Sequence, residues 1–192
     1  MKKLAILTVA FMLSLNIGQL KAQDTKILAK TEAKTANKEK RIEKRGDRRE
    51  LKRLVGTKVS DLSMKNFKTD FANAMDVRWN RTPNYDIAAF TYRNQELKAY
   101  YDADGQLVGT TQFKKFEDLP DKGQKIIHKK YKGYEIGQIL FFNNNDINRS
   151  PMLLWGIEVV DKSNYFVELA KGSDKLVVYV DPGGNVSVFK TL

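Results

Sequence analysis

Two stretches of this chain match each other: ELKAYYDADGQLV at residues 96–108 and KLVVYVDPGGNVS at residues 175–187. Each has the pattern of a strand, a tight turn and the start of another strand. At an offset of 79 residues four identities coincide: Leu97 with Leu176, Tyr100 with Tyr179, Asp102 with Asp181, and Gly105 with Gly184. The match predicts that the chain repeats one structural unit twice.

Side chains alternate in character along both strands, so each strand has one mainly apolar face. We expect this face to pack on helices; it carries Leu97, Ala99, Tyr101, Leu176, Val178 and Val180. The opposite face is half polar and is expected to be exposed to solvent. It carries Tyr100 and Tyr179, and we predict that these two tyrosines bind a partner, because Tyr is favoured at recognition surfaces. Ordinary cross-strand packing is the alternative.

Two segments have the periodicity of amphipathic helices, one before each set of strands. Residues 61–75 carry methionine and phenylalanine at three-to-four spacing, and residues 120–132 begin with a proline and precede a glycine. The strands after each helix have connections too short for crossover helices, so they should pair antiparallel. The predicted fold is α+β: a tandem repeat of one helix plus a four-stranded antiparallel sheet, with repeats at about residues 57–117 and 118–192.

The turn DADG at residues 102–105 has carboxylates beside a glycine, as calcium loops do. A calcium loop would also need carboxylates at the positions that Tyr100 and Thr111 occupy. A hairpin turn fits better, because Asp104 and Gly105 tolerate the positive φ of such turns and the second copy, DPGG, lacks the second aspartate. We therefore predict a turn, with no metal and no cofactor.

Residues 1–22 have the pattern of a secretory signal peptide: a basic start, an uncharged apolar run, and Ala22 before the expected cleavage. A membrane anchor is the alternative, but the run is shorter than the roughly 20 residues that span a bilayer. We expect export to the periplasm or the exterior. The chain has no cysteine, which excludes disulfides, thiolate metal sites and catalytic thiols.

Most of the net charge of +11 belongs to the N-terminal part of the chain. Residues 23–56 are rich in Lys, Arg, Glu and Ala, lack aromatic residues, and should form a charged basic helix or linker. A solvated linker is the simplest interpretation. Contact with an anionic glycan or lipid is the alternative, and no nucleic acid is expected as a partner of an exported protein.

No catalytic residues are predicted. The single histidine, His128, has no recognisable metal or triad partners, and no nucleophile elbow, phosphate loop or zinc-protease motif is present. A hydrolase with two converging carboxylates is the remaining catalytic alternative, since such pairs are invisible in sequence.

The segments FANAMDVRW (71–79) and LPDKGQKIIHKKYKGYEI (119–136), with the YYDADG and VYVDPGG turns, resemble the PepSY-like, beta-lactamase-inhibitor-like proteins exported by Bacteroidetes. The resemblance covers about residues 57–192 and implies tandem helix-plus-four-strand units and a binding or inhibitory role. In the beta-lactamase inhibitor protein the sheet face and loops grip an enzyme. None of its cysteines or contact residues can be matched here, so that target is not implied.

The predicted function is therefore that of an exported, non-enzymatic module that binds a protein or peptide partner, with inhibition as one form this could take. The alternative is an envelope-associated protein whose basic segment, residues 23–56, contacts anionic glycan or lipid.

Overall fold

The computed structural model describes residues 51–159 and 162–192. The predicted signal peptide, residues 1–22, and most of the charged segment, residues 23–56, lie outside the described residues. The chain divides into two compact units, and all described residues belong to the second, Asp47–Leu192. Within the described residues, no helix has both the length and the apolar character needed to cross a membrane.

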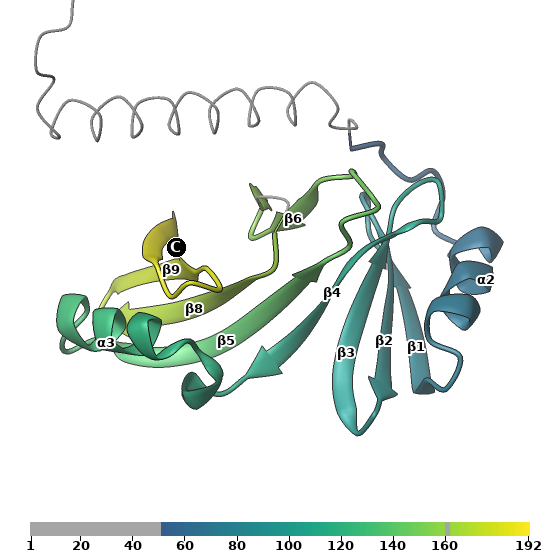
Figure 1. The fold of residues 1–192 in the computed structure, drawn as a ribbon. Coiled ribbons are helices and arrows are strands. Elements are labelled where there is room, and N and C mark those ends of the chain that lie inside the picture. The colour runs from purple at the N-terminus through teal and green to yellow at the C-terminus, as the bar shows by residue number, and fades with distance from the viewer. Residues whose placement is uncertain (1–50, 160–161) are drawn as a thin grey trace, which may run out of the picture. The chain divides into compact units, whose positions relative to one another are not determined.

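Each half of the described unit consists of a helix followed by four strands of a common sheet (Figure 1). The first half contains α2 (Asp61–Asp70), β1 (Met75–Arg81), β2 (Asp86–Tyr92), β3 (Gln95–Tyr101) and β4 (Leu107–Lys114). The second half contains the short 3-10 helix η1 (Phe116–Asp118), α3 (Asp121–Lys130), β5 (Glu135–Asn144), β8 (Asn164–Lys171), β9 (Asp174–Val180) and β10 (Val186–Thr191). A two-stranded hairpin, β6 (Met152–Leu154) and β7 (Ile157–Val159), is inserted between β5 and β8.

The eight long strands form one antiparallel sheet in the order β1-β2-β3-β4-β5-β8-β9-β10. β4 pairs with β5 from Gly109–Asn144 to Lys114–Ile139, and this pairing joins the two halves. The α+β class and the antiparallel pairing are confirmed. Each half contributes one helix and four antiparallel strands, as predicted, and the two sets of strands join into one eight-stranded sheet because the edge of β4 pairs with the edge of β5.

The helix before β1 ends earlier than its apolar spacing predicts. Ser60 caps α2, with its Oγ accepting from the Leu62 N–H at 3.2 Å. The helix ends before Phe71, and a turn follows in which the Ala74 N–H donates to the Phe71 carbonyl at 3.0 Å. Met75, expected in the helix, begins β1 instead. Although they follow the helix, Phe71 and Ala74 pack against the same apolar cluster as Phe67 of α2.

Apolar side chains lie on both faces of the sheet. On one face α2 covers Phe90, Ala99 and Tyr101, and α3 covers a cluster that includes Val178 and Val180, as the alternation predicts. On the other face the inserted hairpin covers a third cluster: Tyr85, Val108, Phe142, Met152, Leu154, Val159, Phe166 and Val177. Figure 1 shows α3 and β6 on opposite sides of β5 and β8.

The exposure predicted for Tyr100 and Tyr179 is therefore wrong. Both side chains are half-buried and pack against the cluster beneath the hairpin. The sequence signal was misleading because the half-polar strands of this face are covered by a segment from elsewhere in the chain.

The segment MLLWGIEV, residues 152–159, turns back on itself at Trp155 and Gly156. Their φ angles are 49° and 73°, and β6 pairs with β7 from Met152–Val159 to Leu154–Ile157. A two-residue loop with positive φ at both positions matches the right-handed twist of a hairpin. The first position of the turn holds Trp155, although bulky residues rarely adopt positive φ.

The two matching turns are hairpin turns, as predicted. In each turn the glycine has positive φ, 66° at Gly105 and 74° at Gly184. The Gly105 N–H donates to the Asp102 carbonyl at 3.0 Å, and the Gly184 N–H donates to the Asp181 carbonyl at 2.8 Å. A side chain at Gly105 would also collide with α2, since a Cβ there would lie 2.8 Å from a Leu62 side-chain atom.

Asp102 connects the first turn to the inserted segment. Its carboxylate is buried and accepts four hydrogen bonds. Two come from the N–H groups of Asp104 at 2.9 Å and Gln106 at 3.0 Å. The other two come from Asn148 Nδ2 at 3.0 Å and Ser150 Oγ at 2.7 Å. The aspartate that a calcium loop would require is thus engaged by protein donors.

We predict that Asp102→Ala lowers the free energy of unfolding by about 3 kcal/mol, because it leaves the buried Asn148 and Ser150 donors without their acceptor. Urea unfolding followed by circular dichroism measures the change. Asp181→Ala is the matched control: the equivalent carboxylate is more exposed and accepts from the N–H and side chain of Asn185. Its loss should cost about 1 kcal/mol or less, and an equal loss in the two variants would contradict the bridging role of Asp102.

Tyr85 makes a second connection to the insertion. Its hydroxyl donates to the Pro151 carbonyl at 2.8 Å and accepts from the Leu153 N–H at 3.0 Å. Burial raises the pKa of Tyr85 from 10.0 to about 12. As the pH rises, the unfolded chain therefore loses this proton first.

The stability that Tyr85 contributes should be fully present below about pH 10 and should fall between about pH 10 and pH 12. Unfolding by urea at a series of pH values tests this. We expect Tyr85→Phe to be less stable than the parent at pH 8 and to lose less stability above pH 10. An unchanged alkaline slope in the variant would contradict the assignment.

Candidate binding site on the open sheet face

The inserted hairpin covers the second half of the sheet face opposite the helices and the adjoining end of the first half, where Tyr85, Tyr100 and Val108 pack in or against its cluster. The Trp155 ring packs on Phe166 of β8 and Phe189 of β10, with centroid distances of 5.8 and 6.1 Å. Lys190 Nζ donates to the Trp155 carbonyl at 2.6 Å. The part of this face formed by β1–β4 is not covered by the hairpin, and we call it the open face. Its side chains are those of Asp76, Arg78, Ala89, Thr91, Glu96, Lys98, Thr111 and Phe113, and Tyr100 lies at its border with the hairpin.

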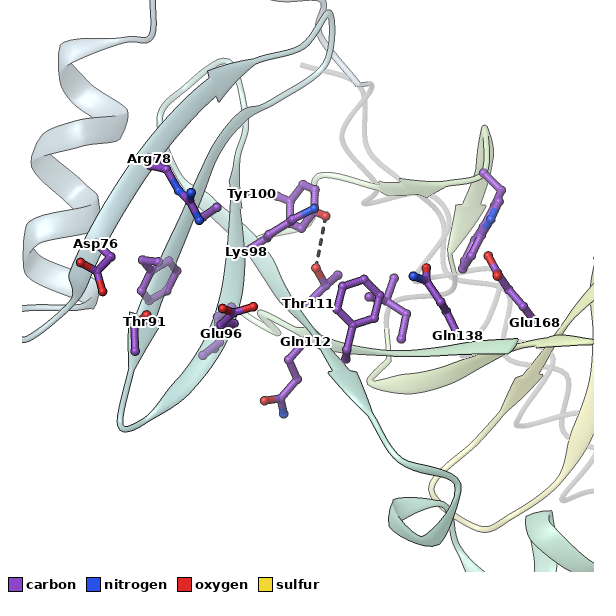
Figure 2. Close-up of a pocket in the computed structure, with 16 residues that line it drawn as sticks. Asp76, Arg78, Thr91, Glu96, Lys98, Tyr100, Thr111, Gln112, Gln138 and Glu168 are labelled. Carbon is purple, nitrogen blue, oxygen red and sulfur yellow. Dashed lines mark hydrogen bonds between the residues drawn. The ribbon is translucent and has the colours of Figure 1, made fainter. Parts of the chain in front are cut away.

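A cavity of about 320 Å³ lies where the open face meets the hairpin. Figure 2 shows the side chains of β1–β3 on one side of it and Gln138 and Glu168 on the other, with Thr111 between them. Trp155 and Leu140 add apolar surface. The cavity therefore combines apolar walls with polar groups from many strands, the usual composition of a binding site.

Phe113 is the most exposed aromatic side chain of this cavity, with 58% of its surface accessible. On β4 it alternates with Gly109 and Thr111, and its cross-strand neighbour on β5 is Leu140. A large exposed apolar side chain beside further apolar surface is typical of an interaction site. The sequence contained the signal for Phe113, since the alternation along β4 places it on the same face as Thr111.

Tyr100 forms one wall of the cavity and is held in place by its neighbours. Its hydroxyl lies 3.2 Å from Thr111 Oγ1, and its ring packs edge-on against Tyr85 at 5.8 Å. Burial raises the pKa of Tyr100, so the phenol is neutral at physiological pH. It can therefore offer both a hydrogen-bond donor and an acceptor to a bound molecule.

Tyr179 lies on the same face but farther along the sheet. It belongs to β9, where Phe166 and Ser187 are its cross-strand neighbours, and it does not line the cavity. The structure thus places Tyr100 and Tyr179 against one apolar cluster without bringing the two rings together. Arg78, Lys98 and Phe113 were not singled out from the sequence, because which strands stay uncovered depends on the insertion.

Charges on the open face are arranged in rows across the strands. Arg78 and Lys98 lie in one row on either side of Ala89, and Glu96 lies in the neighbouring row beside Thr91. A partner with complementary charges would be oriented by these rows.

Three carboxylates line the cavity, those of Asp76, Glu96 and Glu168. Figure 2 shows them spread across the site, with Glu168 on the side opposite Asp76 and Glu96. Among the described residues, no group of three or more His, Cys, Asp or Glu side chains could hold a metal ion.

The fold is shared with solved proteins from Bacteroides species. A BLIP-like protein from Bacteroides fragilis superposes with a TM-score of 0.57 at 15% identity, over 72% of this chain and 89% of the other. A DUF2874 family protein from Bacteroides uniformis gives 0.55 at 14% identity, over 70% and 89%. A protein from Bacteroides eggerthii that is provisionally assigned to the periplasm gives 0.55 at 12% identity, over 70% and 88%.

At these identities the similarity shows a common fold, and it confirms the structural resemblance to beta-lactamase-inhibitor-like proteins. No family model matches the sequence. No curated protein matches it either.

Proposed function

We propose that this chain is an exported, non-enzymatic binding module that holds a protein partner on its open face. The observation that carries the proposal is the exposed Phe113 at the mouth of a cavity lined by charged and aromatic side chains. The pattern of a secretory signal at residues 1–22 supports export. The structural similarity to the Bacteroides eggerthii protein, which is provisionally assigned to the periplasm, also supports export.

A protein partner fits this face better than a small ligand does. The charged side chains Arg78, Lys98 and Glu96 stand outside the apolar part of the cavity and are exposed. Such a polar rim around an aromatic centre is the usual anatomy of a protein interface. A projecting loop could place an apolar side chain against Phe113 and satisfy the charges around it. If the partner is an enzyme and the loop borders its active site, binding would inhibit it.

We predict that Phe113→Glu lowers affinity for the partner at least about tenfold, because it places a charge at the apolar centre of the interface. The full chain, immobilised, is used to capture proteins from its native envelope extract, and the affinity of the purified partner is then measured by calorimetry. Ile147→Glu is the matched control, since Ile147 is 92% exposed and does not line the cavity. Equal binding by both variants would remove the open face from consideration.

Tyr100 and Tyr179 can be compared to distinguish a residue that lines the cavity from one that lies farther along the same sheet face. We propose that both contribute to binding, and we expect Tyr100→Ala to weaken it more than Tyr179→Ala, because Tyr100 lines the cavity. Calorimetric titration with the same partner ranks the two variants, after urea unfolding has confirmed that each is folded. Unchanged affinity in Tyr100→Ala would exclude this residue as a contact.

A further inference from the structure

A second concave surface lies on the helix side of the sheet, on the opposite side from the open face. It is a groove of about 530 Å³ between α2 and β1, and we call it the α2–β1 groove. Its walls are largely apolar, and Asp61, Lys65 and Lys68 stand at its rim. The apolar lining residues are Met64, Phe67, Phe71, Ala72, Ala74, Val77 and Trp79.

The second half of the chain shows what fills the equivalent place. Helix and strand positions correspond at an offset of 60 residues, since α2 begins at Asp61 and α3 at Asp121, and β1 begins at Met75 and β5 at Glu135. From position 61 to position 79 the burial of each residue matches that of its counterpart, with two exceptions. Phe71 and Trp79 are half-buried, whereas their counterparts Tyr131 and Ile139 are 9% and 4% exposed. Both exceptions line the α2–β1 groove.

Residues 116–119 provide the additional burial in the second half. Leu119 is buried in one cluster with Tyr131 and Ile139, and Phe116 packs against that cluster. The Phe116 ring lies 5.0 Å from the His128 ring. Gln124 Nε2 donates to the Leu119 carbonyl at 2.8 Å and so fixes the segment on α3. A phenylalanine and a leucine three residues apart, with Glu117 and Asp118 between them, thus fill the groove beside α3.

Among the residues that the structure describes, the first half has no such segment. The positions 60 residues before Phe116 and Leu119 hold Gly56 and Val59, and the α2–β1 groove includes neither. The chain before α2 runs along the other end of β1, where the Leu54 N–H donates to the Pro83 carbonyl at 2.8 Å. Val77 in the groove is 37% exposed. No residue in the described part of the chain therefore fills the groove beside α2.

We propose that the α2–β1 groove binds an acidic segment of a partner protein that carries an aromatic residue and a leucine three positions apart, in the manner of residues 116–119. The apolar walls match the two large side chains. Lys65 and Lys68 at the rim attract the acidic residues between them. Met64 of α2 occupies the position that corresponds to Gln124 of α3. Its flexible apolar side chain can adapt to an apolar side chain of the partner.

Other segments of this chain do not match the groove. Residues 23–50 lack aromatic side chains and carry an excess of Lys and Arg, so Lys65 and Lys68 would repel them. Residues 116–119 of a second copy are already packed against their own α3. A separate protein is therefore the occupant we infer.

The probe is an acetylated and amidated peptide with the sequence KFEDLPD, which copies residues 115–121. It is titrated into the full chain, labelled with nitrogen-15, while nuclear magnetic resonance follows the indole N–H signals of Trp79 and Trp155. Trp79→Phe assigns the two signals. We expect a saturable shift of the Trp79 signal, with Trp155 unchanged, because Trp79 lines the groove and Trp155 does not. A peptide with alanine in place of its phenylalanine should bind at least about tenfold more weakly.

Variants of the protein locate the site. Val77→Glu should weaken binding at least about tenfold, and the matched control Val188→Glu, on the exposed edge strand β10, should not change it. Lys65→Glu together with Lys68→Glu should also weaken binding. Phe113→Glu should leave it unchanged, so failure here and failure of the open-face proposal are distinguishable.

The proposal is overturned if the Trp79 signal does not shift at millimolar concentrations of the peptide. It is also overturned if the alanine-substituted peptide binds the unmodified protein as tightly as KFEDLPD does, or if Val77→Glu binds KFEDLPD as tightly as the unmodified protein does. It is also overturned if sedimentation shows that the chain dimerises and that Val77→Glu dissociates the dimer, because the occupant would then be a second copy. The proposal is likewise overturned if vesicles that contain anionic lipid shift the Trp79 signal more strongly than the peptide does. The groove would then contact a membrane and not a protein.

Discussion

The backbone pairing between β4 and β5 is the contact on which the rest of this structure depends. It runs from Gly109–Asn144 to Lys114–Ile139 and makes one sheet out of two similar halves. Because the sheet is continuous, alternate residues of β4 and β5 point to faces that extend across both halves. Phe142 thereby enters the cluster beneath the hairpin, while Phe113 and Leu140 line the cavity next to it. The pairing also removes two strand edges that separate sheets would have left unsatisfied.

The inserted hairpin makes the two halves different. Asp102 and Tyr85 hold the insertion to the first half through buried hydrogen bonds, and Trp155 packs on the strands of the second. A carboxylate that accepts four hydrogen bonds can be buried without a basic partner, since each of its lone pairs is satisfied. The insertion therefore lies across the junction and covers the second half together with the adjoining end of the first half. What it leaves uncovered becomes the open face.

A second asymmetry exists on the helix side. Residues 116–119 pack beside α3, whereas none of the residues described in the structure fills the corresponding groove beside α2. The second half is thus covered on both faces, by the hairpin on one and by η1 and α3 on the other. Within residues 51–159 and 162–192, the first half carries a concave surface on each side of its strands that no other described segment fills. The two halves therefore share one architecture but differ in which of their surfaces other described segments cover.

The sequence by itself determined the local structure: the matching turns around Asp102 and Asp181, the helix starts, and the apolar face of Leu97, Ala99 and Tyr101 that packs under α2. These features depend on φ preferences, capping and alternation, which act between residues close in the chain. Only the tertiary structure decided that the halves share one sheet, that Tyr100 and Tyr179 are half-buried, and that Phe113 stays exposed. Those outcomes depend on which strand edge β4 satisfies and on where the insertion lies. The pairing of β4 and the position of the insertion are set by contacts between residues far apart in the chain. A short-range sequence pattern does not encode which residues such contacts bury.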